Sequence, residues 1–373
     1  MKPLFKYPGG KYKEYEYIKE FFPLKIDNYF EPFLGGGGIY FRLYNDRLVK
    51  GTRHINDYSI SLINFYRSVC DDSFIDELNK LSDAWDYIKE FSEEFFIKYG
   101  EKFTDMLSNK SEGSFVDDDM RDYIEKRVSN CNLNFHSFLL CDKIIYCLND
   151  KLKRFVKKKL DESENTTYKC ITTGICQAFY FIIRDMYNDW NNNGNESLYT
   201  LNERSAQWFF IREFCFGSMF RFNPDGDFNI PYGGYAYNHK CFKCKVDTIT
   251  LEETKKLFKT TDIECGDFED FIKKYSYGEN DFMFLDPPYD STFTDYDGNG
   301  FGRDEHIRLH KVLSECKCKW LMDIGKTDFI YNLYKDFNII EIDKTYMYQA
   351  RGTYDNKHTS HLIITNYNPG KLF

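Results

Sequence analysis

The chain has 373 residues, an apolar fraction of 42%, an aromatic fraction of 19% and a formal net charge of −9. This length allows two or three domains, or one large domain with an insertion, and the apolar content is sufficient for a real core. The negative charge argues against a protein that coats nucleic acid indiscriminately, although a locally basic groove is compatible with it.

No apolar run approaches the ~20 residues of a membrane span, so none is expected. Residues 1–10 are polar, with lysines and a Gly-Gly pair, and do not resemble a signal peptide. Twelve cysteines without a disulfide pattern favour a reducing interior, where they act as small buried hydrophobes. Cys241 and Cys244 have the spacing of half a zinc site, but no second such pair and no paired-histidine motif accompanies them. We therefore expect a cytoplasmic protein that is not secreted and holds no metal.

The first 66 residues alternate between predicted helices and strands. A basic, Gly-rich loop at residues 6–11 runs into a helix at about 13–22, and a strand at 29–34 closes on four glycines. A helix begins near residue 39, and a second strand ends at Asp57 before an amphipathic helix through Leu62, Phe65 and Tyr66.

The pattern changes over residues 67–205, where charged helical segments alternate with polar stretches and β-branched strands are scarce. We interpret this region as an inserted, mostly helical domain. It contains a basic run from Lys151 to Lys159 that is equally compatible with phosphate contacts and with a solvated helix face balanced by the acidic residues after it. The apolar stripe of residues 177–184 is more typical of a core helix.

Strand and helix alternate again from about residue 263, with further strands expected at 282–285, 320–322, 338–340 and 361–364. Such alternation predicts an α/β fold with a doubly wound sheet, whose ligands bind at the carboxyl ends of the strands. The expected domains are a catalytic domain of residues 1–66 and 206–373 and the insertion of residues 67–205.

A strand, a glycine cluster and a helix in that order suit a ligand that approaches the backbone closely at a helix N-terminus. Asp57 at the end of the next strand suits the hydroxyls of a ribose. The chain has Phe33-x-Gly35-x-Gly37 instead of G-x-G-x-x-G, and it has no G-x-x-x-x-G-K-[ST] motif. The pattern therefore predicts a nucleoside cofactor without a pyrophosphate.

The turn Asp286-Pro287-Pro288-Tyr289 follows the apolar run at 282–285. Its prolines fix the backbone and lack N–H groups, so the turn offers acceptors: a carboxylate, a carbonyl and an aromatic face. Such a set suits the capture of a planar amine, because accepting hydrogen bonds from both amine protons makes its nitrogen more nucleophilic. The alternative is a strand that ends in a proline turn beside a surface aspartate.

These motifs, in this order, resemble the Dam-type (D12 class) S-adenosylmethionine-dependent DNA adenine-N6 methyltransferases. The cofactor motif is Glu31-Pro32-Phe33-Leu34-Gly35-Gly36-Gly37, and the catalytic motif is Asp286-Pro287-Pro288-Tyr289. Lys6 to Lys11, Arg221 to Gly233 and Leu362 to Tyr367 also match. The resemblance implies a Rossmann-like methyltransferase sheet with an inserted target-recognition domain. It also implies the transfer of a methyl group to a flipped-out adenine in duplex DNA.

The resemblance assigns roles residue by residue. Lys11 would pair with the cofactor carboxylate, and Asp57 would bind its ribose. Asp286 and the Pro287 carbonyl would accept from the target amine, while Tyr289 stacks on the extruded base. The residues implied in cofactor binding are Tyr7, Lys11, Glu31, Phe33, Gly35, Gly37, Asp57, Asp267, Phe268 and Asp286. The residues implied in catalysis are Asp286, Pro287, Pro288 and Tyr289.

Candidate DNA contacts are Arg212, Arg221 and Asn223, near the Arg221 to Gly233 motif, together with Lys153 and Lys157. At the fifth expected strand, where the family often has Ser-Asn, this chain has Asp323-Ile324. Two alternatives stay open at this point. One is the same chemistry on cytosine N4 or on adenine in RNA, and the other is a non-catalytic nucleic-acid-binding relative.

Overall fold

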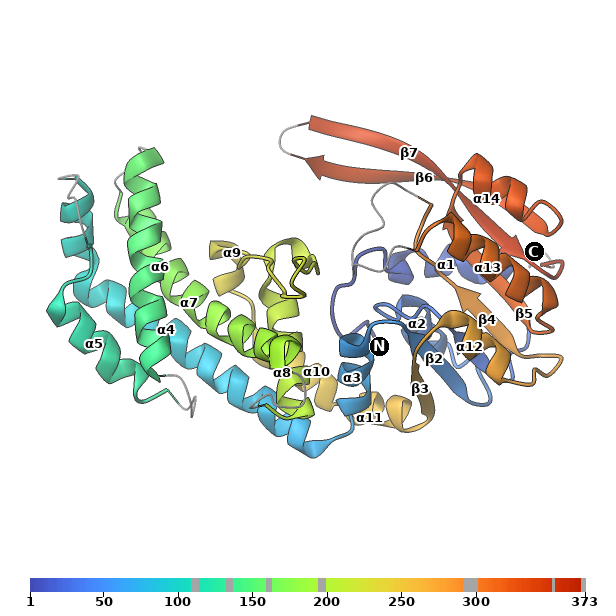
Figure 1. Ribbon diagram of the computed structural model, residues 1–373, viewed down its shortest axis with the longest axis horizontal. Helices are drawn as coiled ribbons and strands as arrows, with labels where there is room; N and C mark the ends of the chain where they lie inside the picture. Colours follow the sequence, from blue (N-terminus) through green and yellow to red (C-terminus); the bar gives the residue numbers. More distant parts are fainter. Residues whose placement is uncertain are drawn as a thin grey trace. The chain divides into compact units, whose positions relative to one another are not determined.

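The computed structural model describes residues 1–108, 114–131, 137–158, 163–193, 199–290, 301–350 and 353–369. The chain forms two compact units, unit 1 with residues 1–70 and 252–373 and unit 2 with residues 71–251 (Figure 1). The boundary at the end of unit 2 therefore lies at 251/252, whereas it was expected at 205/206. The reason is that helix α8 (Leu201–Phe214) runs through that position and packs on the long helix α4 (Asp72–Ser108).

Unit 1 is built on a seven-stranded sheet with the order β3-β2-β1-β4-β5-β7-β6. The first five strands in the chain are parallel, and β7 joins β5 antiparallel, with β6 antiparallel at the edge. This arrangement confirms the predicted α/β sheet and adds an antiparallel edge that the sequence analysis did not specify. The strands are β1 (Tyr29–Glu31), β2 (Arg53–Asp57), β3 (Thr261–Cys265), β4 (Phe282–Leu285), β5 (Lys319–Gly325), β6 (Asn338–Ala350) and β7 (Thr353–Thr365).

The helices of unit 1 connect these strands, as expected for parallel strands joined by crossovers. The predicted helix at 13–22 is a series of short helical turns. The helices are η1 (Lys11–Lys13), α1 (Tyr15–Ile18), η2 (Lys19–Phe21), α2 (Gly38–Asn45), α3 (Ile60–Ser68), α11 (Glu252–Lys259), α12 (Phe268–Lys274), α13 (Arg303–Glu315) and α14 (Asp328–Leu333).

The core of unit 1 explains why its central strands are continuous apolar runs. Every residue of β4 is buried, which is typical of a parallel strand covered on both faces. Met283 and Trp320 from β4 and β5 pack in one cluster with Leu309 of α13 and Phe271 of α12. This burial holds the carboxyl ends of β1, β2, β4 and β5 at one edge of the sheet.

The two C-terminal strands continue beyond the sheet as a two-stranded ribbon. β7 pairs with β5 only from His361 to Thr365, whereas β6 and β7 pair with each other from Asn338–Thr365 to Ala350–Thr353. Figure 1 shows this ribbon extending past β5. The sequence analysis found only the ends that pair within the sheet, at residues 338–340 and 361–364.

Unit 2 is mostly helical, as the sequence analysis expected of its first part. Its aromatic core packs Trp85 of α4 against Phe179, Phe210 and Phe214 of the neighbouring helices. Helix α8 begins with a capping box between Thr200 and Glu203. The other helices are α5 (Asp118–Val128), α6 (Ser137–Lys158), α7 (Glu164–Asn193), η4 (Phe216–Ser218), α9 (Tyr235–Asn238) and α10 (Phe242–Thr250).

A tight loop in unit 2 carries the motif that begins at Arg221. Phe222 and Phe228 form an antiparallel bridge. The side chain of Asn188 on α7 both donates to the Phe228 carbonyl and accepts from the Phe228 N–H, at 3.1 and 2.9 Å. Tyr180 of α7 donates to the Ile230 carbonyl at 2.8 Å. These bonds fix the loop on a helix of its own unit.

The cysteines of the chain differ in their oxidation state. Cys241 and Cys244 are joined by a disulfide at the start of α10, so the expectation that the cysteines are reduced is wrong for this pair. The remaining cysteines are free, and six of them are buried.

Among the helices of the described residues, none is both long and apolar enough to cross a membrane.

Asn28 connects the starts of β1, β2 and β4. Its backbone N–H and side-chain amide both donate to Asp281, at 3.0 Å each, and its side-chain oxygen accepts from the Thr52 N–H at 3.0 Å. We expect Asn28→Ala to lower the free energy of unfolding of unit 1 by about 2 kcal/mol, because it leaves part-buried partners unsatisfied. Chemical denaturation followed by circular dichroism measures this effect. The exposed Asn332→Ala is the control, and an equal loss in both variants would contradict the prediction.

Candidate active site

The glycine run after β1 receives the N-terminal loop of the chain itself. A Cβ at Gly36 would lie 2.6 Å from the Tyr7 Cβ, and one at Gly38 would lie 2.7 Å from the Tyr12 nitrogen. Gly35 and Gly37 have φ angles of +49° and +66°, a region that side chains disfavour. The glycines are therefore needed for this internal contact as well as for any approach of a ligand.

Asp57 at the end of β2 is tied to the same loop. Its two carboxylate oxygens accept from the backbone N–H groups of Gly35 and Ser59, at 2.8 and 2.9 Å. Tyr66 of α3 donates to the Gly35 carbonyl at 3.2 Å. The predicted cofactor residues Tyr7, Gly35 and Asp57 thus form one connected region at the carboxyl ends of β1 and β2.

Lys11 is the centre of a second group and is only 3% exposed. Its Nζ lies 3.4 Å from Asp286, 3.5 Å from Asp323 and 3.6 Å from Glu14, and it donates a hydrogen bond to the Tyr289 hydroxyl. The structure therefore brings the predicted residue Lys11 together with Asp286 and Tyr289, from which it is far apart in the sequence. Pro287 is buried and Pro288 is exposed in the turn between them.

The electrostatics of this group couple its members. Burial disfavours the charge on Lys11, but Asp286 and Asp323 outweigh it and raise the pKa of Lys11 well above its usual range. Burial also raises the pKa of Asp286 to about 7, against the opposing effect of Lys11. Lys11 thus stays protonated, while Asp286 changes its charge near neutral pH.

Glu31 lies deeper in the same region and is 2% exposed. Burial raises the pKa of Glu31 well above its usual range, and the charges of Asp286 and Asp57 raise it further. The Tyr29 hydroxyl donates to Glu31 at 2.7 Å and opposes this shift. Glu31 is therefore electrostatically linked to both groups described above.

Three residues in or beside the Lys11 group were not predicted as site residues: Glu14, Asp323 and His361. Asp323 on β5 is fully buried, and its Oδ1 lies 2.9 Å from the Nδ1 of His361 on β7. The ring of His361 packs edge-on against the ring of Tyr289, with centroids 5.5 Å apart. The available signal was an aspartate inside the apolar run 320–324, where a buried charge needs a partner.

A third group of predicted residues is aromatic. Phe33 packs on Phe268 with ring centroids 5.5 Å apart, and Phe301 packs on both rings at 5.7 and 5.8 Å. Asp267, which precedes α12, accepts two hydrogen bonds from Arg308 at 2.7 and 2.8 Å, and these bonds lower the pKa of Asp267. In this structure Asp267 is thus a helix cap and an ion-pair partner.

The candidate DNA contacts all lie in unit 2. Lys153 and Lys157 are exposed on α6, whose buried face carries Leu152 and Phe155. The end of the basic run, Lys159, lies outside the described residues. The predicted contacts on α6 are therefore placed on a solvated helix face.

The three candidates near the loop differ in their surroundings. Arg221 is exposed. The side chain of Asn223 accepts from the Asp227 N–H at 2.7 Å and shapes the turn. Arg212 is 2% exposed, and its guanidinium lies 4.7 Å from the Phe220 ring centroid. This burial makes Arg212 part of the core of unit 2, which does not support the predicted DNA contact at that position.

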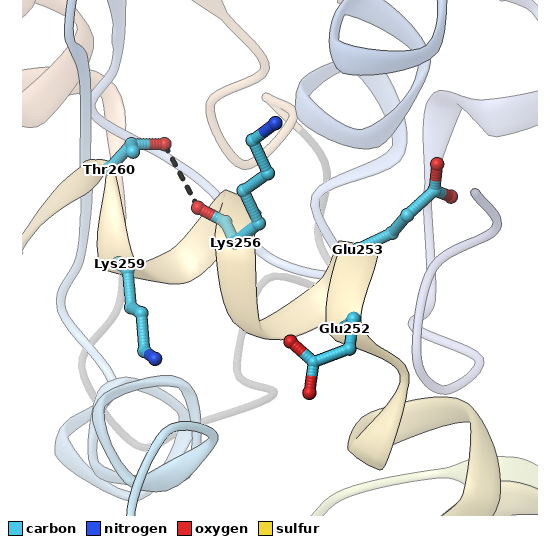
Figure 2. Close-up of a pocket in the computed structure, with 5 residues that line it drawn as sticks. All are labelled: Glu252, Glu253, Lys256, Lys259 and Thr260. Carbon is cyan, nitrogen blue, oxygen red and sulfur yellow. Dashed lines mark hydrogen bonds between the residues drawn. The ribbon is translucent and has the colours of Figure 1, made fainter.

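A surface hollow in unit 1 is formed by residues outside these groups. It is lined by side chains of α11 and of the turn after it, where Thr260 donates to the Lys256 carbonyl at 3.1 Å (Figure 2). Its walls carry two carboxylates and two ammonium groups and no aromatic ring. Nothing in this set suits a nucleoside. The residues that line it are Glu252, Glu253, Lys256, Lys259 and Thr260.

The arrangement at the carboxyl edge of the sheet supports a specific chemistry. The carboxylate of Asp286, which can ionise near neutral pH, lies close to the ring of Tyr289. The buried ammonium group of Lys11 connects both residues to the N-terminal loop. This set can bind a small zwitterion and accept hydrogen bonds from a planar amine.

Comparisons with known proteins agree with this chemistry. Residues 7–144 and 140–348 match the model of the family described as D12 class N6 adenine-specific DNA methyltransferase. The Type II methyltransferase M.CviBI of Paramecium bursaria Chlorella virus NC1A is 35% identical over 54% of this chain and 76% of its own length. The Type II methyltransferase M.MjaIII of Methanocaldococcus jannaschii is 30% identical over 66% of this chain and 83% of its own length.

A third relative matches along almost the whole length. The Type II methyltransferase M1.LlaDCHI of Lactococcus lactis subsp. cremoris is 24% identical over 98% of this chain and 96% of its own length. These matches favour adenine N6 in DNA over cytosine N4, RNA or a non-catalytic role. The chain belongs to the D12 class of N6 adenine-specific DNA methyltransferases, and it is an enzyme that methylates adenine in DNA.

Proposed function

We propose that the enzyme transfers a methyl group from S-adenosylmethionine to N6 of an adenine flipped out of duplex DNA, within a specific sequence. The observation that carries this proposal is the group of Lys11, Asp286 and Tyr289 at the carboxyl edge of the sheet. The extruded base would stack on Tyr289, and Asp286 with the Pro287 carbonyl would accept from its two amine protons.

The charges of the described residues support this cofactor. The carboxylates of Asp286, Asp323 and Glu14 surround a single ammonium group, that of Lys11. This excess of negative charge favours a cationic ligand. Lys11 would hold the carboxylate of the methionine part, Asp57 the ribose and the Phe33–Phe268 pair the adenine. When bound, the cofactor supplies an electrophilic methyl group on a sulfonium.

The residues of the chain would act on the amine. Hydrogen bonds to Asp286 and the Pro287 carbonyl would localise the lone pair of N6 and make this nitrogen a better nucleophile toward the methyl group that the cofactor supplies. The nitrogen then carries a positive charge and loses a proton. Asp286, on the catalytic turn of residues Asp286 to Tyr289, would accept this proton.

We further propose that unit 2 recognises the target. The loop at 220–230 is fixed on α7 by Asn188 and Tyr180 and presents the exposed Arg221. The exposed Lys153 and Lys157 supply charges for phosphates. Asn223 would contribute through the shape of the turn. This support comes from exposure and rigidity within unit 2 alone.

Asp286→Ala tests the catalytic assignment. We expect the rate of N6-methyladenine formation to fall about 10²-fold or more, because the variant removes an acceptor that acts on the reacting nitrogen. The enzyme is incubated with labelled S-adenosylmethionine and unmethylated DNA, and modified nucleosides are identified by mass spectrometry. Asp304→Ala is the control, since Asp304 is an exposed aspartate on α13. Full activity of Asp286→Ala, or label only in cytosine, would reject the assignment.

The pH dependence follows from the raised pKa of Asp286. Asp286 is a stronger hydrogen-bond acceptor when ionised, and only the ionised form can take up the proton of the amine, so the rate should increase with pH through about 7 and level off above it. The measurement is kcat/KM for the cofactor, which reports on the free enzyme. In the cofactor-bound enzyme this rise, the acidic limb of the pH profile, should lie at lower pH, because the positive charge of the sulfonium stabilises the ionised form of Asp286 and lowers its pKa. A flat kcat/KM profile between about pH 6 and 8 would contradict this prediction.

Salt dependence tests the role of α6. The double variant Lys153→Ala/Lys157→Ala should reduce the slope of log Kd against log salt by about 2, one for each lost phosphate contact. Fluorescence anisotropy with a duplex measures the slope. The control is Lys126→Ala/Lys243→Ala, which removes two exposed lysines elsewhere in unit 2. Equal changes in the two double variants would show that Lys153 and Lys157 make no specific phosphate contacts.

A further inference from the structure

Asp286 and Asp323 occupy equivalent places on neighbouring parallel strands. β4 and β5 pair with Leu285 opposite Met322, and the two aspartates are the next residues along each strand. Two carboxylates so placed repel each other unless a cation lies between them. Lys11 provides that cation almost symmetrically, with its Nζ 3.4 Å from one aspartate and 3.5 Å from the other.

The strand pairing explains how His361 reaches Asp323. β5 and β7 are antiparallel, with Asp323 opposite Ile363 and Gly325 opposite His361. Asp323 and His361 are therefore diagonal neighbours whose side chains point to the same face of the sheet. Gly325 has no side chain, and a Cβ there would already touch the Tyr289 ring at 3.5 Å. The histidine and the tyrosine thus share the space beside Asp323.

The two aspartates differ in what they can do. Asp323 is fully buried and bonded to His361, whereas Asp286 is 20% exposed on the catalytic turn. A carboxylate that neutralises a lysine by itself accepts more weakly elsewhere, because one of its acceptor sites and most of its charge are engaged in that ion pair. Asp286 is therefore a stronger acceptor for the target amine when another carboxylate shares the charge of Lys11.

We propose that Asp323, oriented by His361, is a positioning residue that shares the Lys11 ammonium with Asp286 and so keeps Asp286 available as the acceptor for the adenine amine. This inference rests on the proposed catalytic role of Asp286. It assigns Asp323 and His361 no contact with substrate or cofactor.

The charges around Asp286 give the proposal a definite sign. Burial is the largest cause of the raised pKa of Asp286, Lys11 lowers this pKa, and the charge of Asp323 raises it. Removing the charge of Asp323 therefore lowers the pKa of Asp286 and strengthens its pair with Lys11. The ionisable groups around Asp286 are Lys11 and Glu14 from the N-terminal segment, Glu31 from β1, Tyr289 from the catalytic turn, Asp323 from β5 and His361 from β7.

The test is the nearly isosteric Asp323→Asn. We expect kcat for N6-methyladenine formation to fall about 10-fold, because Asp286 becomes a weaker acceptor. We also expect the acidic limb of the kcat/KM profile to move to lower pH by about one unit. Asp323→Glu, which restores the charge, should return the limb toward its position in the unchanged enzyme. A purely structural role would lower the rate without moving the limb downward.

Glu14→Gln is the matched control. It removes another carboxylate close to Lys11, at 3.6 Å, but one that is 22% exposed and better screened by solvent. The acidic limb of its kcat/KM profile should move to lower pH by less than the limb of Asp323→Asn does. Equal shifts in the two variants would show that only total charge matters, and the proposal would fail.

A second variant protects the test against misfolding. If Asp323→Asn does not fold, Asp323→Ser removes the same charge with a smaller side chain and replaces it. Failure of both to fold would make Asp323 a structural residue and overturn the proposal. If the Asp286→Ala variant methylates DNA as well as the unchanged enzyme does, the proposed catalytic role of Asp286 itself is wrong. If Asp286 is required but Asp323→Asn leaves the limb in place, only the role of Asp323 is wrong.

Discussion

The ammonium group of Lys11 is the interaction on which the rest of the site depends. A buried charge must be matched by nearby opposite charges, and breaking such a group by removing one partner costs about 3–5 kcal/mol. Lys11 meets carboxylates from its own segment, from the turn after β4 and from β5. The N-terminal loop must therefore lie across the sheet edge, and Gly36 and Gly38 leave the space for it. One lysine thus connects the glycine motif, the catalytic turn and the antiparallel edge of the sheet.

The sequence predicted the parts of this site that follow from strand order. Parallel strands end at a common edge, so the glycine run, Asp57 and Asp286 could be expected to lie near one another without any knowledge of the packing. The pairing of Asp323 with His361 could not be foreseen in this way. It depends on β7 lying between β5 and β6 in antiparallel register, and the apolar pattern of β7 is compatible with several neighbours.

Unit 2 shows a different limit on prediction. Charge and apolar pattern predict its helices. The resemblance, however, counts the Arg221 to Gly233 motif as part of the catalytic portion, and residues 206–251 are therefore expected in the other domain. Arg212 illustrates why motif proximity is a weak guide. Its neighbours Trp208 and Phe220 surround the guanidinium, and a long side chain with an apolar stem is easily buried among aromatic rings. Exposure in the fold, as for Arg221, separates the two cases.

The acidic surroundings of Lys11 also give the proposed reaction a direction. In the proposed reaction, the sulfonium of the methyl donor would be attracted by the carboxylates of Asp286, Asp323 and Glu14, whereas the thioether left after transfer would be neutral at sulfur and would lose this attraction. The positive charge would then pass to the adenine nitrogen, which the proposal places beside Asp286. Because the pKa of Asp286 lies near 7 before the cofactor binds, the carboxylate can take up this proton and pass it to solvent through its exposed side. The same charge balance that holds Lys11 in the core would thus bind the cationic donor, stabilise the charge as it moves and weaken the hold on the spent cofactor.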